Sequence, residues 1–131
     1  AVPIPAELPP LEAAPAPPAQ ARGVTPATIA EGQALFMGNC ALCHSNQHRS
    51  ITPDLRRMSE GAHQAFRQIV LEGLLLGNGM PRWDDRLSEA DVDKIHAYLI
   101  DLQAKTRAEE LEKIKRGLPL DTPGLTILSN Y

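Results

Sequence analysis

Aromatic side chains are scarce in this sequence. Its 131 residues include one Trp, two Tyr and two Phe, which together make up 4% of the chain. Large rings bury much of the apolar area in a small protein core, so this composition excludes a core built mainly on aromatic packing. A chain of this length fits one domain plus tails, and such a domain is marginal unless apolar mass comes from elsewhere. A bound cofactor would supply that mass.

Other absences exclude further classes of protein. The 13 basic residues do not outnumber the 16 acidic ones, and the net charge of -3 leaves no basic footprint for nucleic acid. No apolar run approaches the roughly 18 residues that a transmembrane helix needs. No segment shows the pattern of a strand, so we expect an all-α fold. The N-terminus has neither an initiator Met nor a basic region, and we expect a mature or excised chain whose targeting segment has been removed.

Proline is concentrated at one end of the chain. Residues 1–27 contain eight of the twelve prolines, with alanine filling much of the remainder. Proline lacks an N–H and fixes φ, so we expect an extended, semi-rigid linker or arm there. It would serve as a tether to an upstream element or lie along a partner, the alternative being a disordered leader.

Helical periodicity begins after this arm. The sequence predicts a first helix over residues 26–39, capped by Thr25 or Thr28. Ser59 is expected to cap a second helix, whose apolar positions continue to Leu74 until "GNGMP" ends it at residues 77–81.

Ser88 and Asp91 form a capping-box-like pair that predicts a third helix. Its apolar stripe contains Val92, Ile95, Tyr98, Leu99 and Leu102, and the pattern continues to Gly117, which fits a C-terminal cap. We therefore treat residues 105–131 as a helical extension followed by an irregular tail.

The stretch "GNCALCHSNQHRS" holds the residues with the most specific chemistry. Cys40, Cys43, His44 and His48 are acceptable zinc ligands, and a small zinc-binding interaction module is the alternative hypothesis. However, zinc ligands usually come from two separated pairs. A disulfide shuttle would need a Cys-x-x-Cys at the start of a helix in a βαβ unit, and this sequence has no strands. C-x-x-C-H is the attachment signature of c-type haem, with two thiols for the porphyrin and a histidine for the iron. The spacing thus favours one covalent haem c.

Haem iron has a sixth position, and Met80 is the preferred candidate to fill it. It lies in "GNGMP", where glycines allow a close approach and a proline fixes the exit of the loop. His63, at a helix start, is expected to be solvent-exposed, and His96 is expected to be a buried, hydrogen-bonded core histidine. The remaining candidates are Met37, Met58 and His48.

These residues together resemble the class I c-type cytochrome family. The likeness is carried by Gly32 and Phe36 in "EGQALFMGNCALCH", by Tyr98 in "DKIHAYLIDL", and by "TPDL" and "GNGMP". The resemblance implies the cytochrome c fold, with three main helices around one covalently bound haem. It also implies that the first and last helices cross with an aromatic residue at the crossing, that the carbonyl of Pro53 orients His44, and that Met80 is the distal ligand.

The likeness covers residues 28–104, which we take as the cytochrome c domain. Within the family, "PDLR", "GNGMPRW" and "LSEADVDKIHAYL" look most similar to the C-terminal haem c domain of type II quinohaemoprotein alcohol dehydrogenases. In those enzymes a proline-rich linker joins a quinone-bearing propeller to the haem domain, and residues 1–27 suit such a linker.

These observations predict an electron-transfer protein, or the haem subunit of a dehydrogenase, and not an enzyme in its own right. His/Met ligation raises the reduction potential relative to bis-His ligation. Arg56, Arg57, Arg82 and Trp83 are candidate partners for the haem propionates. We expect a dehydrogenase as the electron donor, a respiratory-chain component as the acceptor and, from the family resemblance, a periplasmic location.

Overall fold

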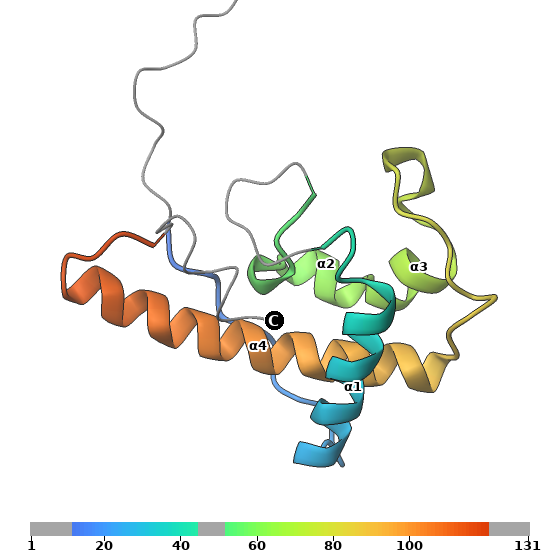
Figure 1. Cartoon of the computed structure of the whole chain (residues 1–131), viewed down its shortest axis with the longest axis horizontal. Helices are drawn as coiled ribbons and strands as arrows, with labels where there is room; N and C mark the ends of the chain where they lie inside the picture. Colours follow the sequence, from blue (N-terminus) through green and yellow to red (C-terminus); the bar gives the residue numbers. More distant parts are fainter. Residues whose placement is uncertain (1–11, 45–51, 121–131) are drawn as a thin grey trace, which may run out of the picture.

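The computed structural model describes residues 12–44 and 52–120, and within these ranges it contains helices, turns and irregular segments but no strand. The all-α prediction is thereby confirmed (Figure 1). The helical elements in chain order are α1 (Pro26–Asn39), the 3-10 turn η1 (Leu55–Arg57), α2 (Glu60–Gln64), α3 (Phe66–Leu71), the 3-10 turn η2 (Leu76–Asn78) and α4 (Glu89–Lys115). The longest helix, α4, lies beneath α2 and α3, and α1 crosses it (Figure 1).

The crossing of α1 over α4 organises the core. Gly32 of α1 is buried, and a Cβ at this position would lie 1.9 Å from the carbonyl oxygen of Lys94. The missing side chain lets the two backbones meet at this point. Beside it, the rings of Phe36 and Tyr98 are in contact, with centroids 5.5 Å apart and a tilt of 47°. The predicted crossing with an aromatic residue is present.

The helices α1, α2 and α4 begin at the capping residues that the sequence predicts. Thr25 caps α1 and exchanges hydrogen bonds with Thr28, while Ser88 and Asp91 form the same reciprocal pair at the start of α4. The hydroxyl of Ser59 accepts from the backbone N–H of Ala62 at the start of α2. Each cap satisfies backbone N–H groups that have no partner inside the helix.

The predicted second helix is in fact two short helices. The chain leaves helical geometry at Ala65 (φ -95°, ψ 12°), α3 ends at Leu71, and Gly73 then adopts a φ of +72° that favours glycine. The expected continuation to residue 77 was wrong because this turn redirects the chain. As a result Leu74 lies on the surface, with 60% of its area exposed, and does not belong to the core.

The arm, as far as it is described, lies along the protein's own last helix. Ala14 is completely buried, its carbonyl oxygen accepts from Arg107 (2.8 Å), and the carbonyl oxygen of Pro15 accepts from Gln103 (3.0 Å). Further along, the side-chain amide of Gln20 donates to the carbonyl of Ala97 (2.7 Å). In Figure 1 this segment appears as the blue chain that runs beside α4 toward α1.

The helix α4 continues past residue 104 without a break and ends at Lys115, and Gly117 follows the C-cap residue Arg116 with a φ of +70°. The N–H groups of Gly117 and Leu118 donate to the carbonyls of Ile114 (3.0 Å) and Lys113 (2.8 Å), a Schellman cap. The division of the chain at residues 27 and 104 stays a prediction. Among the described residues, no helix is both long enough and apolar enough to span a bilayer. The expected irregular tail over residues 121–131 lies outside the described residues.

Candidate haem site

The C-x-x-C-H segment folds as a tight turn at the end of α1. The N–H of Cys40 donates to the carbonyl of Phe36 (2.8 Å), and the N–H of His44 donates to the carbonyl of Cys40 (2.9 Å). Cys40 is half-buried and Cys43 is exposed. Burial, with a smaller contribution from Cys43, raises the pKa of the Cys40 thiol from its ordinary value to about 11. Both thiols therefore lie on one short loop, with the histidine directly after them.

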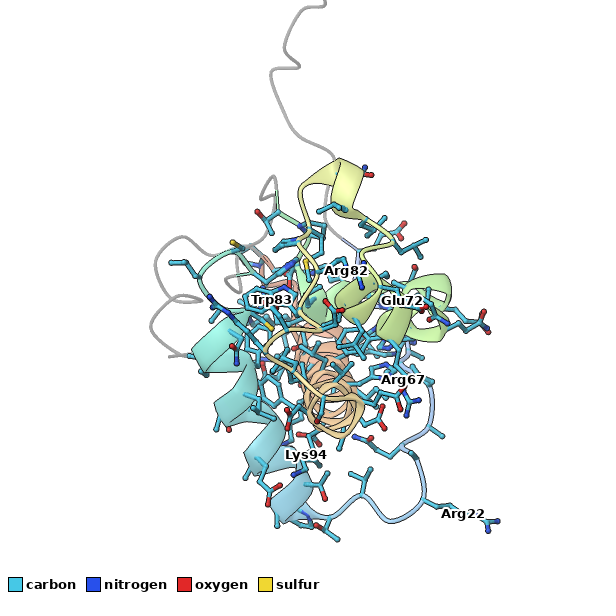
Figure 2. All side chains as sticks on the ribbon, turned by 90° about the vertical axis from the view of Figure 1, so that its right-hand side faces the viewer. Arg22, Arg67, Glu72, Arg82, Trp83 and Lys94 are labelled. Atoms are coloured by element: carbon cyan, nitrogen blue, oxygen red, sulfur yellow. The ribbon has the colours of Figure 1, made fainter. Side chains whose placement is uncertain are left out.

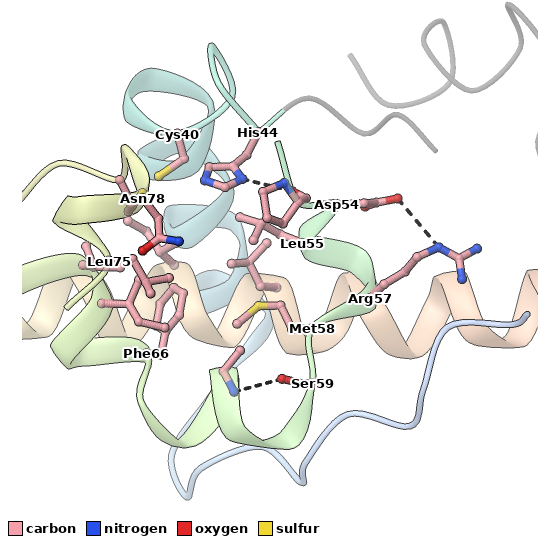
Figure 3. A pocket seen from close by; sticks show the side chains of 17 residues that line it. Cys40, His44, Asp54, Leu55, Arg57, Met58, Ser59, Phe66, Leu75 and Asn78 are labelled. Atoms are coloured by element: carbon pink, nitrogen blue, oxygen red, sulfur yellow. Dashed lines mark hydrogen bonds and ion pairs between the residues drawn. The ribbon is translucent and has the colours of Figure 1, made fainter. Parts of the chain in front are cut away.

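A cavity of about 400 Å³ opens next to this turn, between η1, α2, α3 and α4 (Figure 3). Its walls are mostly apolar, and Figure 3 shows Cys40 and His44 at one side and Phe66 and Met58 at another. The lining residues are Cys40, His44, Pro53, Asp54, Leu55, Arg57, Met58, Ser59, Ala62, Phe66, Ile69, Val70, Leu75, Asn78, Met80, Ile95 and Leu99. A volume of this size is within the range of cofactor sites, and it supplies the apolar burial that the scarce aromatics do not.

The imidazole of His44 is held by the loop that follows. Its Nδ1 lies 3.0 Å from the carbonyl oxygen of Pro53 (Figure 3). A carbonyl oxygen only accepts, so this hydrogen bond requires the proton on Nδ1 and leaves the Nε2 lone pair available for a metal. The geometry suits an axial ligand with an oriented ring.

Met80 lines the same cavity as Cys40 and His44. It follows Gly79, whose φ is +95°, and its N–H donates to the carbonyl of Leu75 (3.2 Å). Further on, the N–H of Trp83 donates to Val70 (2.9 Å) and anchors the loop against α3. Met58 is a second methionine in the lining, with only 7% of its area exposed.

The four candidate propionate partners lie in different settings. Arg56 is buried and pairs with Asp54 through two hydrogen bonds of 2.9 and 2.8 Å, outside the cavity lining. Arg82, labelled in Figure 2, is half-exposed and pairs with Asp84 (2.8 Å). Arg57 lines the cavity, and Trp83 packs against the core.

Two of these side chains have buried donors without a hydrogen-bond partner. These donors are Nε of Arg57 and Nε1 of Trp83. Among the residues that the structure describes, no other side-chain nitrogen or oxygen is buried without a hydrogen-bond partner. Buried donors without partners are rare and costly. A haem places two carboxylates at one edge, so these orphan donors, together with the thiols and the apolar cavity, fit that group.

The histidines away from the turn serve a different purpose. His63 is 6% exposed, so the expectation that it is solvent-exposed was wrong. Its Nδ1 lies 2.9 Å from Nε2 of His96, and its Nε2 lies 2.8 Å from Oε1 of Gln103. His96 also stacks on Phe66. Burial, and secondarily the neighbouring His63, lower the pKa of His96 to about 4. His96 is half-buried, less than expected, and the two histidines form a satisfied polar network at the edge of the core.

The lining also includes residues that the sequence did not single out. Phe66 and Asn78 are the main examples. Asn78 is two positions before Met80 in "GNGMP", and that proximity is the signal by which it could have been found.

The described residues offer no metal site for the zinc alternative. Among residues 12–44 and 52–120, no group of three or more His, Cys, Asp or Glu side chains could hold a metal ion. His48, the fourth proposed ligand, lies outside the described residues.

A helical fold with this turn at the edge of an apolar cavity defines an electron-carrying c-type cytochrome with covalently bound haem c. Residues 27–99 match the family model described as cytochrome C oxidase, cbb3-type, subunit III, and the chain belongs to this family of c-type cytochromes.

Known relatives fall into two groups. The chain is 33% identical to cytochrome c6 of Chlorolobion braunii over 85 residues, which covers 60% of this chain and 94% of that one. It is 38% identical over 102 residues to quinohemoprotein alcohol dehydrogenase ADH IIB of Pseudomonas putida, which covers 72% of this chain but 14% of the enzyme. The solved structure of ADHIIG from Pseudomonas putida HK5 superposes with a TM-score of 0.63 at 32% identity, over 84% of this chain and 16% of that one.

The chain therefore spans about one seventh of the dehydrogenase relative ADH IIB, whereas it spans nearly all of the cytochrome c6. These matches confirm the predicted family, fold and covalent haem c, together with the role of electron carrier.

Proposed function

We propose that this protein transfers single electrons through a haem c whose iron is ligated by His44 and Met80. The observation that carries the proposal is the shared cavity that Cys40, His44 and Met80 line together. When bound, the haem supplies the one-electron couple of its iron, and the residues of this chain hold it, orient it and exclude water.

The attachment turn fixes the position of the cofactor. Cys40 and Cys43 would form the two thioether bonds, and His44 follows them directly. Because the carbonyl of Pro53 holds Nδ1 of His44 at 3.0 Å, the ring presents Nε2 and is made more basic. Covalent attachment and an oriented imidazole together keep the group from dissociating.

Met80 would complete the ligation with a soft, neutral thioether. Held by both His44 and Met80, the iron would have no site for an exogenous ligand, and the chemistry that it would supply is outer-sphere electron transfer. A His/Met pair also raises the reduction potential.

Arg57, which lines the cavity, and Trp83, which packs against the core, would meet the propionates. Arg57 and Trp83 supply buried donors that otherwise lack partners, and a guanidinium pairs strongly with a carboxylate. Arg56 and Arg82 are already paired with Asp54 and Asp84, which makes them weaker candidates for this role.

The donor is proposed to be a dehydrogenase and the acceptor a component of a respiratory chain, in the periplasm. The likeness to the haem-bearing part of two quinohemoprotein alcohol dehydrogenases of Pseudomonas putida supports a quinoprotein alcohol dehydrogenase as the donor. Covalent haem attachment in bacteria takes place outside the cytoplasmic membrane, which supports the periplasmic location.

The ligation is tested with Met80→Ala, and Met58→Leu is the matched control. Both methionines line the cavity, but Leu approximately conserves the volume and apolar character of Met58. We expect the reduced Met80→Ala protein to bind carbon monoxide readily and its oxidised form to become high-spin, while Met58→Leu and the wild type stay low-spin. A low-spin Met80→Ala protein beside a high-spin Met58→Leu protein would transfer the ligand role to Met58.

A further inference from the structure

Glu110 is a buried carboxylate at a position that electron transfer through His44 and Met80 does not explain. It lies on the C-terminal part of α4 and is only 3% exposed. One carboxylate oxygen accepts from the backbone N–H of Ala14 (2.9 Å), and the other forms an ion pair with Nη2 of Arg57. A buried carboxylate is costly unless it is paired and hydrogen-bonded, and here both conditions are met.

The partner of Glu110 is an arginine that lines the cavity. Nη2 of Arg57 is taken by Glu110, and Nη1 donates to the backbone carbonyl of Glu12. Its Nε lies 3.9 Å from the carboxylate of Asp54 and has no hydrogen-bond partner. In Figure 3, Arg57 sits at the margin of the cavity beside α4. The two terminal nitrogens are thus fixed, which determines where Nε can point.

The N-terminal arm covers this ion pair. Ala14 has no exposed area, and its carbonyl oxygen is bound by Arg107 of α4. The side chain of Arg57 is 20% exposed and that of Glu110 is 4% exposed. Salt screens buried pairs much less than exposed ones. Glu110 and Ala14 both lie outside residues 27–99, where the chain matches its family.

We propose that Glu110 is a positioning residue that holds Arg57 against the haem cavity and balances its charge, so that it sets the reduction potential of the cofactor through Arg57. This inference rests on the proposed function. Reduction adds one electron, so a nearby positive charge favours the reduced state and a nearby negative charge opposes it. Glu110 therefore lowers the potential that Arg57 alone would impose.

The test measures the midpoint potential of the holoprotein by optical redox titration in the wild type, Glu110→Gln and Glu109→Gln. In Glu110→Gln the amide oxygen of the new side chain can still accept from Arg57, so the guanidinium stays in place while its charge balance is lost. We expect the equilibrium constant for reduction to rise threefold to tenfold, and tenfold corresponds to about 59 mV for one electron. Glu109 is exposed on the same helix, and its substitution removes the same formal charge with a shift well below threefold.

Introducing Glu110→Gln into an Arg57→Gln variant distinguishes an effect of Glu110 that depends on Arg57 from a direct effect of Glu110 on the haem. In that background Glu110 has no guanidinium to hold at the cavity and no charge on it to balance, so Glu110→Gln should shift the potential less than it does in the wild type. An equal shift in both backgrounds, or equal shifts for Glu110→Gln and Glu109→Gln, would overturn the proposal.

A second variant, Arg57→Lys, tests the same proposal if Glu110→Gln does not fold. Arg57→Lys keeps the charge, but an ammonium lacks the planar fork and cannot reach Glu110, the Glu12 carbonyl and the cavity together. We expect a lower potential than in the wild type, and an unchanged potential would contradict the inference. Failure of the proposed function would instead appear in the wild type, as a spectrum without His/Met ligation.

Discussion

Replacing Gly32 with alanine should force apart the two helices that carry the fold. A Cβ at position 32 would lie 1.9 Å from the carbonyl oxygen of Lys94, 2.5 Å from its carbonyl carbon and 3.0 Å from Cβ of Tyr98. The obstacle is mainly backbone in the middle of α4, which cannot turn away as a flexible side chain would. The substitution therefore requires α1 to move.

The size of the effect follows from that displacement. Non-bonded heavy atoms are favourably separated by about 3.5 Å, and a gap of roughly 1 Å already forfeits up to half of the attraction between facing atoms. The contact between Phe36 and Tyr98 and the burial of Leu99 both depend on this crossing. Overpacking typically costs about 1–3 kcal/mol, and alanine returns at most about 1 kcal/mol of helix propensity. We expect a net destabilisation of about 2 kcal/mol.

Gly38→Ala is the matched control, because Gly38 belongs to the same helix and nothing lies within 4 Å of a Cβ built there. It should gain up to about 1 kcal/mol from helix propensity, so the two variants should differ by about 3 kcal/mol. With a urea m-value of about 1–3 kcal/mol/M, equilibrium unfolding would separate their midpoints by at least about 1 M. Equal midpoints for Gly32→Ala and Gly38→Ala would show that the backbones of α1 and α4 do not meet at Gly32, and would refute the reasoning.

Two further predictions concern stability. Ser88→Ala removes the hydroxyl that accepts from the N–H of Asp91 at the start of α4, and it should lower the free energy of unfolding by about 1 kcal/mol, measured by urea titration; an unchanged value would mean that the cap contributes nothing. His96 has a folded-state pKa of about 4 against an ordinary value of 6.5, so the unfolded chain binds a proton first as the pH falls, and stability should decrease between about pH 6.5 and 4. Unfolding measured across this range should show a weaker decrease in His96→Gln, and identical slopes in the two proteins would refute the assignment.

Local signals in the sequence were sufficient for the starts of α1, α2 and α4 and for the end of α4. The caps at Thr25, Ser59 and Ser88 act through hydrogen bonds to residues three positions away, so the sequence alone contains both partners. The last helix also ends as predicted, because Gly117 adopts positive φ at little steric cost.

For the candidate site, the sequence indicated the residues that share the cavity but not their electrostatic partners. Cys40, His44 and Met80 are separated by loops of recognisable chemistry, and the structure places all three in one lining. By contrast, which arginine faces the cavity depends on competition for carboxylates. Asp54 takes the guanidinium of Arg56, and the sequence places Arg56 and Arg57 side by side without ranking them.

Long-range polar contacts could not be predicted from the sequence, because their partners lie far apart in the chain. His63 was expected to be exposed because it opens a helix, but Gln103, 40 positions later, accepts from one of its ring nitrogens. No periodic pattern reports such a pair. The early end of α3 was likewise missed, although Gly73 adopts a φ of +72° two residues after Leu71.

The proline-rich arm and the buried polar residues of α4 have a common explanation. Proline offers a carbonyl but no N–H, so a segment rich in proline can dock mainly by accepting hydrogen bonds, and the surface beneath it must supply donors. Gln103 and Arg107 do so, donating to the carbonyls of Pro15 and Ala14. An N–H that does remain, that of Ala14, needs an acceptor and finds it in Glu110. The composition of the arm therefore accounts for the burial of polar side chains along α4, and through Glu110 it links the docking of the arm to the arginine at the cavity.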